Sequence, residues 1–142
     1  FDLTAMCDIR IAADHARFGE NFVNMGLIPG DGGAYFLQRV VGYQRAAELT
    51  LTGRLFDAKE AKEIGFLLDA VPADQLMDRA TTLAQEIASK PRYQVRQSKL
   101  LMRIAQQMNL SDFLDHTALV QGTCHHSNAH KDAVAAFVNK GK

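Results

Sequence analysis

The sequence of 142 residues contains no tryptophan, three prolines and two cysteines. Cys7 and Cys124 show no metal-ligand spacing, which predicts no metal site and reduced thiols in a cytoplasmic protein. The sixteen acidic and sixteen basic residues cancel, so no net field would attract nucleic acid. No apolar run reaches the roughly 18 residues that a membrane span needs. We therefore expect neither a nucleic acid nor a membrane as a partner.

What the sequence does contain is the composition of a globular protein, with 47% apolar and 23% charged residues. The length suits one domain or part of a larger one. Phe1-Asp2-Leu3 lacks an initiator methionine and a signal-peptide pattern, and the next residues have the character of a helix interior. These features predict that the chain was cut from a longer parent.

The first half of the sequence predicts short elements joined by tight turns. They lie at residues 2–7 (helix), 8–12 and 16–18 (strands), 21–25 (helical turn), 32–40, 44–51 and 58–64 (helices) and 66–71 (strand). Ile9 and Ile11 fall on one face of the first strand. Asp57 and Glu60 have the spacing of a capping box, which predicts the start of the last of these helices.

The second half of the sequence has a different character. Apolar residues recur at helical spacing from Leu76 onward, and Pro91 interrupts this pattern. Helices are expected at residues 73–89, 93–108, 112–122 and 131–138. Ser111 is the predicted N-cap of the third. The change predicts a boundary between residues 1–72, part of an α/β core, and residues 73–142, a helical region.

A loop rich in glycine and proline precedes the helix expected at 32–40. Gly30, Gly32 and Gly33 have no Cβ, so the backbone there can approach a ligand closely. The N-terminus of the helix would also stabilise the carboxylate of Asp31. We therefore expect this loop to form one wall of a ligand-binding site.

Seven short blocks follow one another along essentially the whole chain. They are residues 7–12 (CDIRIA), 16–19 (ARFG), 26–33 (GLIPGDGG), 51–54 (LTGR), 58–65 (AKEAKEIG), 71–72 (VP) and 135–137 (AAF). In this order they resemble the second half of the crotonase (enoyl-CoA hydratase/isomerase) superfamily. The resemblance implies an α/β, crotonase-like fold, with the last ββα turn of a spiral core followed by a helical C-terminal trimerisation region.

The resemblance also implies a chemistry. The family's shared step is the stabilisation of a thioester enolate by two backbone N–H groups, each worth about 3–4 kcal/mol. This implies a lyase or isomerase that acts on an enoyl-CoA or other acyl-CoA thioester, with no metal and no redox cofactor. Both donors would precede Phe1, so the chain is expected to be a fragment that lacks the N-terminal half. The alternative is a non-catalytic pseudoenzyme or assembly module that kept the fold.

Hydratases of the family place one glutamate where this sequence has Asp2 and a second where it has Phe22. Aspartate moves the carboxylate back by one C–C bond, and phenylalanine cannot transfer a proton. Asp31 and Glu20 could substitute, which makes Asp2, Asp31 and Glu20 the candidate catalytic residues. The other interpretations are a helix cap for Asp2 and for Asp31, and a solvated turn residue for Glu20.

Binding residues and partners follow from the same resemblance. The wall that contacts the substrate would include Phe22, Leu27, Pro29 and Gly30. Phe137 and Lys140 would lie near the adenine and phosphate end of CoA, where a lysine pairs with a phosphate as a point charge. The alternative for this segment is a solvated terminus. The family further implies a homo-oligomer, either a trimer or a dimer of trimers.

Overall fold

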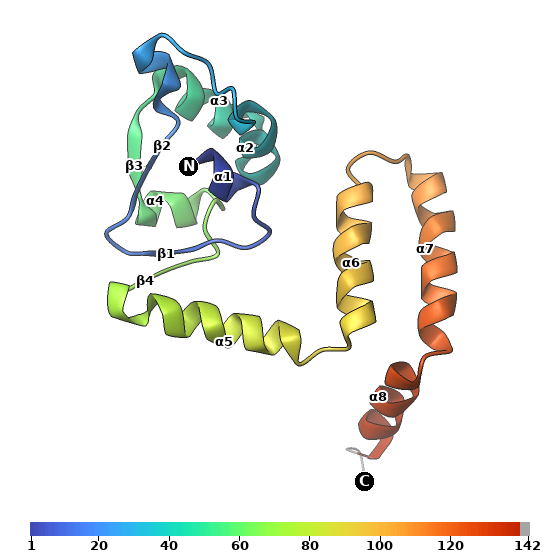
Figure 1. Cartoon of the computed structure of the whole chain (residues 1–142). Coiled ribbons are helices and arrows are strands. Elements are labelled where there is room, and N and C mark those ends of the chain that lie inside the picture. The colour runs from blue at the N-terminus through green and yellow to red at the C-terminus, as the bar shows by residue number, and fades with distance from the viewer. Residues whose placement is uncertain (140–142) are drawn as a thin grey trace. The chain divides into compact units, whose positions relative to one another are not determined.

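The computed structural model describes residues 1–139 (Figure 1). The chain divides into two compact units, one from Phe1 to Thr82 and a second that begins at Leu83. The first unit combines short strands with helices, whereas the second is helical. This division reflects which residues contact one another. The domain boundary that the sequence predicts after residue 72 stays a prediction.

The elements are short in the first unit and longer in the second. The first unit contains α1 (Asp2–Ala5), β1 (Ile11–Ala13), β2 (Arg17–Gly19), the 3-10 helix η1 (Asn21–Met25), α2 (Gly33–Val41), α3 (Tyr43–Thr52), β3 (Leu55–Asp57), α4 (Ala58–Glu63), β4 (Asp69–Val71) and the 3-10 turn η2 (Ala73–Gln75). The helix α5 (Leu76–Ala88) runs across the division. The second unit contains α6 (Arg92–Ile104), α7 (Leu110–His125) and α8 (Asn128–Asn139).

Two pairs of strands give the first unit its β content. β1 pairs with β4 in parallel, with Ile11 opposite Asp69. β2 pairs with β3 in antiparallel fashion, with Phe18 opposite Phe56. The parallel pair joins strands far apart in the sequence, so the β2–β3 pair and the helices α2 to α4 lie between them along the chain.

A hydrophobic cluster fills the first unit. Its buried members are Ala5, Leu37, Ala46, Leu49, Phe56, Ala58, Ala61, Phe66 and Leu67. Four aromatic rings, those of Phe1, Phe18, Phe56 and Phe66, pack at its centre with centroids 4.7 to 6.3 Å apart. Because these rings come from the start of α1, from the β2–β3 pair and from the segment after α4, they hold α1 and its Asp2 against the core.

The first strand begins later than the sequence predicts. It was expected at residues 8–12, but β1 starts at Ile11. The preceding Arg10 donates its Nε to the carbonyl oxygen of Phe66 at 2.6 Å, and its guanidinium lies 5.0 Å from the centre of that ring. The carbonyl oxygen of Arg10 also accepts from the amide of Leu68 at 2.8 Å, so the segment before β1 is tied both to the core and to the segment before β4.

The strand expected at residues 66–71 is also shorter, because β4 spans Asp69–Val71. The amides of Phe66 and Leu67 donate instead to the carbonyl oxygen of Ala61, which closes the end of α4. The sequence did not predict β3 at all. It has three residues, of which the last, Asp57, is the N-cap of α4, and it shows no alternation long enough to indicate a strand.

One predicted helix cap is confirmed and one is wrong. The Oδ1 atom of Asp57 accepts a hydrogen bond from the amide of Glu60 at 2.8 Å, as the capping box predicts, although the Glu60 carboxylate pairs with an arginine instead of closing the box. Ser111 does not cap α7. That helix starts at Leu110, two residues earlier than predicted, and the Oδ1 of Asn109 caps it by accepting from the amide of Asp112 at 3.0 Å.

The second unit has no core of its own among the residues described. No residue of α6, α7 or α8 is buried. Large apolar side chains lie on their surfaces, with Leu119 75% exposed and Phe137 81% exposed. Within residues 1–139, no helix combines the length and the apolar character that crossing a membrane requires.

Candidate functional site

Asp2 opens α1 and is buried, with 3% of its surface exposed. The helix starts after Phe1, and its N-terminus has no capping bond from a side chain. The Asp2 carboxylate packs instead on Gly33, the first residue of α2, where an added Cβ would lie 2.5 Å from the Asp2 Cγ. The cap interpretation of Asp2 is therefore wrong. Because Gly33 has no side chain, the carboxylate can approach the N-terminus of α2, where an anion is favoured.

Glu20 follows β2, precedes η1 and is 1% exposed. The interpretation of Glu20 as a solvated turn residue is therefore wrong. None of the carboxyl oxygens of Glu20 and Asp2 has an N–H or hydroxyl partner in the described part of the chain. Burying a carboxyl without a donor is costly, so the two groups gain if a proton is shared with a neighbouring carboxyl.

Asp31 lies exposed in the loop before α2. Gly32, with φ of +105°, is the N-cap of that helix, and no side chain caps it, so the cap interpretation of Asp31 is also wrong. The Asp31 carboxyl lies close to that of Asp2, and the two groups affect each other's pKa. The structure thus brings together the three carboxyls that the sequence singles out, and their participation in catalysis stays a prediction.

The environment separates the pKa values of these three groups. Burial, helped by a hydrogen bond to Asp2, raises the pKa of Glu20 to about 8. The hydrogen bond with Asp2 also raises the pKa of Asp31. Burial acts to raise the pKa of Asp2, but hydrogen bonds from Glu20 and Asp31 outweigh it and leave that pKa below its ordinary value. At neutral pH the cluster therefore combines a carboxylate with a carboxylic acid, which can accept and donate protons.

The predicted substrate-binding residues lie on η1 and on the loop that follows it. Phe22 and Pro29 are half-buried, whereas Leu27 is 56% exposed and Gly30 is also exposed. Gly26 turns the chain from η1 into this loop with φ of +68°, a conformation that favours glycine. The loop therefore offers an apolar, accessible surface, and its role in binding stays a prediction.

The ion pairs around Arg54 were not predicted from the sequence. Its Nε donates to Glu48 Oε1 at 2.5 Å, and its Nη1 donates to Glu60 Oε2 at 3.0 Å. Hydrogen bonds to Glu60 and Glu48 raise the pKa of Arg54, and in return they hold the pKa of each glutamate below its usual range. The partners lie on two different helices, so no single helical spacing could have revealed this network. It links α3 to α4 beside the core.

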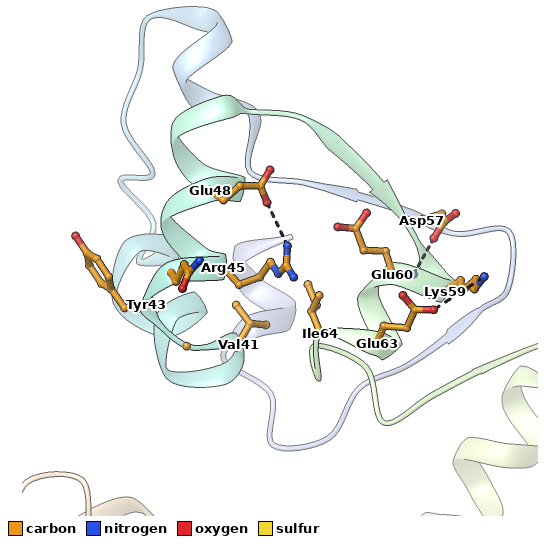
Figure 2. Close-up of a pocket in the computed structure, with 11 residues that line it drawn as sticks. Val41, Tyr43, Arg45, Glu48, Asp57, Lys59, Glu60, Glu63 and Ile64 are labelled. Atoms are coloured by element: carbon orange, nitrogen blue, oxygen red, sulfur yellow. Dashed lines mark hydrogen bonds and ion pairs between the residues drawn. The ribbon is translucent and has the colours of Figure 1, made fainter.

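A separate hollow of about 870 Å³ lies between α3 and α4 (Figure 2). Tyr43, Arg45 and Glu48 line it from α3, and Lys59 and Glu63 line it from α4. Arg45 lies 4.0 Å from Glu48 and Lys59 lies 4.0 Å from Glu63 along their helices, and Glu48 and Glu60, which also line the hollow, are the partners of Arg54. None of the candidate catalytic carboxyls lines this hollow, so we do not assign it to the candidate site.

The remaining predicted residues lie in the second unit. Phe137 is on α8, and Lys140 lies outside the described residues, so the role of both in binding CoA stays a prediction. In residues 1–139, no group of three or more histidine, cysteine, aspartate or glutamate side chains is arranged to hold a metal ion.

Comparison with known proteins places this geometry in a family. The family model for enoyl-CoA hydratase/isomerase matches residues 1–142. The chain belongs to the enoyl-CoA hydratase/isomerase family. The short-chain-enoyl-CoA hydratase of Clostridium acetobutylicum is 35% identical over 141 residues, which cover 99% of this chain and 54% of that protein. The crotonyl-CoA hydratase of Syntrophomonas wolfei is 33% identical over 141 residues, again 99% of this chain and 54% of that protein.

Solved structures of this family confirm the fold. The crystal structure of an enoyl-CoA hydratase from Bacillus anthracis matches with a TM-score of 0.92 at 35% identity, and the match covers 97% of this chain and 54% of that one. The α/β, crotonase-like fold expected from the sequence is therefore confirmed. This member of the enoyl-CoA hydratase/isomerase family spans about half the length of the relatives named here.

Proposed function

We propose that the protein carrying this chain is an acyl-CoA lyase or isomerase, of which the chain is the C-terminal half. Its substrate is an enoyl-CoA or other acyl-CoA thioester, and the reaction is a hydration or isomerisation through an enolate. The names of the relatives and the half-length match support this proposal. The backbone N–H groups that polarise the thioester carbonyl would come from the other half. No metal or redox cofactor enters the reaction.

The observation that carries the proposal is the contact among Asp2, Glu20 and Asp31 beside the N-terminus of α2. Hydration needs a base that takes a proton from water as the water oxygen bonds to the β-carbon. It also needs an acid that gives a proton to the α-carbon of the enolate. An exposed carboxylate that takes the proton from water becomes the acid that gives it to the α-carbon, so one carboxyl supplies both. Asp31 is the exposed member, and Asp2 exchanges a proton with it through their hydrogen bond, which restores the pair after each turnover.

The proposal extends to binding and assembly. Phe22, Leu27, Pro29 and Gly30 would contact the acyl group, because the loop they form is apolar and accessible. Phe137 and Lys140 would contact the adenine and phosphate end of CoA. The whole protein would be a cytoplasmic homo-oligomer, a trimer or a dimer of trimers.

The test is an assay of the whole protein that carries this chain, with crotonyl-CoA and then with isomer and dienoyl substrates, following the enoyl absorbance. We expect turnover, and we expect Asp2→Asn and Asp31→Asn to lower kcat by about 10²- to 10⁴-fold. Asp14→Asn is the matched control, because the Asp14 side chain is 60% exposed in a turn. Absence of turnover on every substrate would overturn the proposed activity. Turnover that neither variant alters would overturn the assignment of the two residues.

A second candidate function is a non-catalytic assembly module. It is favoured by Phe22, a half-buried phenylalanine on η1 at the position where the resemblance expects a second acid. Calorimetric titration of the whole protein with CoA separates the two candidates. An enzyme binds CoA and turns over a thioester, whereas a module that only assembles does neither.

A further inference from the structure

Asp2 and Glu20 form a buried pair that is costly when both groups are ionised. They are 3% and 1% exposed; the Glu20 carboxyl oxygens have no N–H or hydroxyl donor in the described part of the chain, and the Asp2 carboxyl lies against Gly33 at the start of α2. Two carboxylates in contact and away from water repel each other strongly. A single proton held between them removes the repulsion and gives each group a hydrogen-bond partner.

The surroundings of Asp2 favour the anion at that position. Its carboxylate lies against Gly33 at the start of α2, where free amide groups and the helix dipole stabilise negative charge. Asp31 hydrogen-bonds it from the exposed loop. Asp2 is therefore the member that accepts hydrogen bonds from two sides.

The surroundings of Glu20 favour the neutral acid. Its hydrogen-bond partner is Asp2, and the negative charges of Asp2 and Asp31 both disfavour its ionisation, with the α-amino group of Phe1 acting weakly in the opposite direction. The nearby Arg54, which precedes β3, does not neutralise Glu20, because its guanidinium is bound to two other glutamates.

We propose that Glu20 is a positioning residue that keeps its proton at neutral pH and donates it to Asp2, so that Asp2 remains a buried carboxylate in a fixed orientation. This inference rests on the proposed function, in which Asp2 exchanges protons with Asp31. Glu20 is sealed from solvent and acts only through Asp2. Consistent with this role, burial and Asp2 raise the pKa of Glu20 to about 8. When Glu20 ionises, it stops donating and repels Asp2 instead.

The first test measures the proton on Glu20 directly and needs no substrate. The chain has five glutamates, so labelling them with ¹³C at Cδ gives a spectrum simple enough to assign. We expect that the resonance lost in Glu20→Gln titrates near pH 8 in the unmodified chain, and that it is retained in Glu86→Gln, which changes an exposed glutamate. Titration of Glu20 within the ordinary range of glutamates would overturn the inference, whatever the protein catalyses.

The second test uses the pH profile of the whole protein. Wild-type kcat should fall as the pH rises through about 8. Glu20→Gln keeps an N–H donor that cannot ionise, so it should retain activity within about tenfold of wild type and lose this alkaline fall. The leucine in Glu20→Leu has no donor, so kcat of this variant should be at least tenfold lower than that of Glu20→Gln. Equal losses in both variants, with the alkaline fall unchanged, would overturn the inference. If the wild type turns over no thioester, the proposed function fails and the titration decides the inference alone.

Discussion

The two units of this chain are stabilised in different ways. The first buries nine apolar residues in one cluster that includes Leu37, Leu49 and Phe66. In the second, α6, α7 and α8 bury no residue, and their apolar side chains, such as Leu119, lie exposed. The second unit therefore has helix-to-helix contacts, such as the hydrogen bond from Gln94 to Ser127, without a buried apolar interior, whereas the first has a packed interior.

This difference explains where unusual chemistry can arise in the chain. A carboxyl acquires a strongly shifted pKa only where packing excludes water and forces it against another group. Asp2 and Glu20 meet that condition because the core holds α1 and β2 in place. The geometry of the candidate site therefore depends on the packing of the core in the first unit. The variants below test this dependence.

The largest contrast is expected between two leucines. Leu49→Ala removes a side chain that is fully buried in the first unit and should lower the free energy of unfolding by about 3 kcal/mol. Leu119→Ala removes a side chain that is 75% exposed on α7 and should change it by less than about 0.5 kcal/mol. Urea unfolding followed by circular dichroism measures both. Equal losses would show that the two units do not differ as described.

The next effect is a dependence of stability on pH in the first unit. Glu20 has a pKa of about 8 in the folded chain and an ordinary value of 4.5, so the folded state holds more protons between these values. The stabilisation by Glu20 is full below pH 4.5 and is lost as the pH rises to about 8. The free energy of unfolding should fall by roughly 1 kcal/mol per pH unit between pH 6 and 8. Asp2 acts in the opposite sense, because its lowered pKa means that its contribution is lost as the pH falls.

Two glutamate variants assign this pH dependence. Glu20→Gln should flatten the fall between pH 6 and 8, because glutamine does not titrate. Glu86→Gln should leave it as it is, since Glu86 is exposed on α5. Denaturant unfolding at a series of pH values measures the free energy of unfolding of both variants across this range. A slope that persists in Glu20→Gln would assign the effect to another group.

A smaller effect is expected from two glycines, one in each unit. Gly33→Ala places a Cβ against the Asp2 carboxylate and should lower the free energy of unfolding by about 1–2 kcal/mol. Gly122→Ala adds a methyl group on α7 with nothing within 4 Å and should stabilise that helix by about 0.5–1 kcal/mol. Thermal unfolding with two probes, the aromatic signal and the helical signal, separates the effects. Destabilisation of similar size by both substitutions would contradict the proposed packing of Asp2.

Much of the fold was predictable because the first unit is punctuated by glycines and caps. The glycine pair before α2, Gly53 after α3 and the Asp57 cap each mark a helix boundary within a residue or two of its place. The strands were less predictable because their limits depend on partners far away in the sequence. Arg10, just before β1, contacts Phe66 and Leu68 more than fifty residues later, which no local pattern of residues shows.

The candidate site was predictable in its members but not in its burial. Asp2 was singled out because it stands where the family has a glutamate, Glu20 as a nearby substitute for the acid missing at Phe22, and Asp31 by its place in the glycine loop. The sequence around Glu20 nevertheless has the polar character of a surface turn. Its burial is a tertiary effect, because Glu20 joins β2 to η1 and these elements pack on β3 and α3, and such contacts have no local signature. Its raised pKa is a consequence of that contact, so the sequence could not have indicated it.

The smallest expected effect concerns the start of α7. Asn109→Ala removes the side chain that accepts from the Asp112 amide and should destabilise the helix by about 1 kcal/mol. Ser111→Ala, at the position that the sequence predicted as the cap, lies inside the helix and should cost nothing or add slight stability, because alanine has the higher helix propensity. Hydrogen exchange of the amides in the first turn of α7 reports both. Faster exchange in Ser111→Ala than in Asn109→Ala would mean that the cap lies where the sequence placed it. Asp57→Ala, the equivalent change in the first unit, should instead lower the unfolding free energy of the core, because α4 buries Ala58 and Ala61 there.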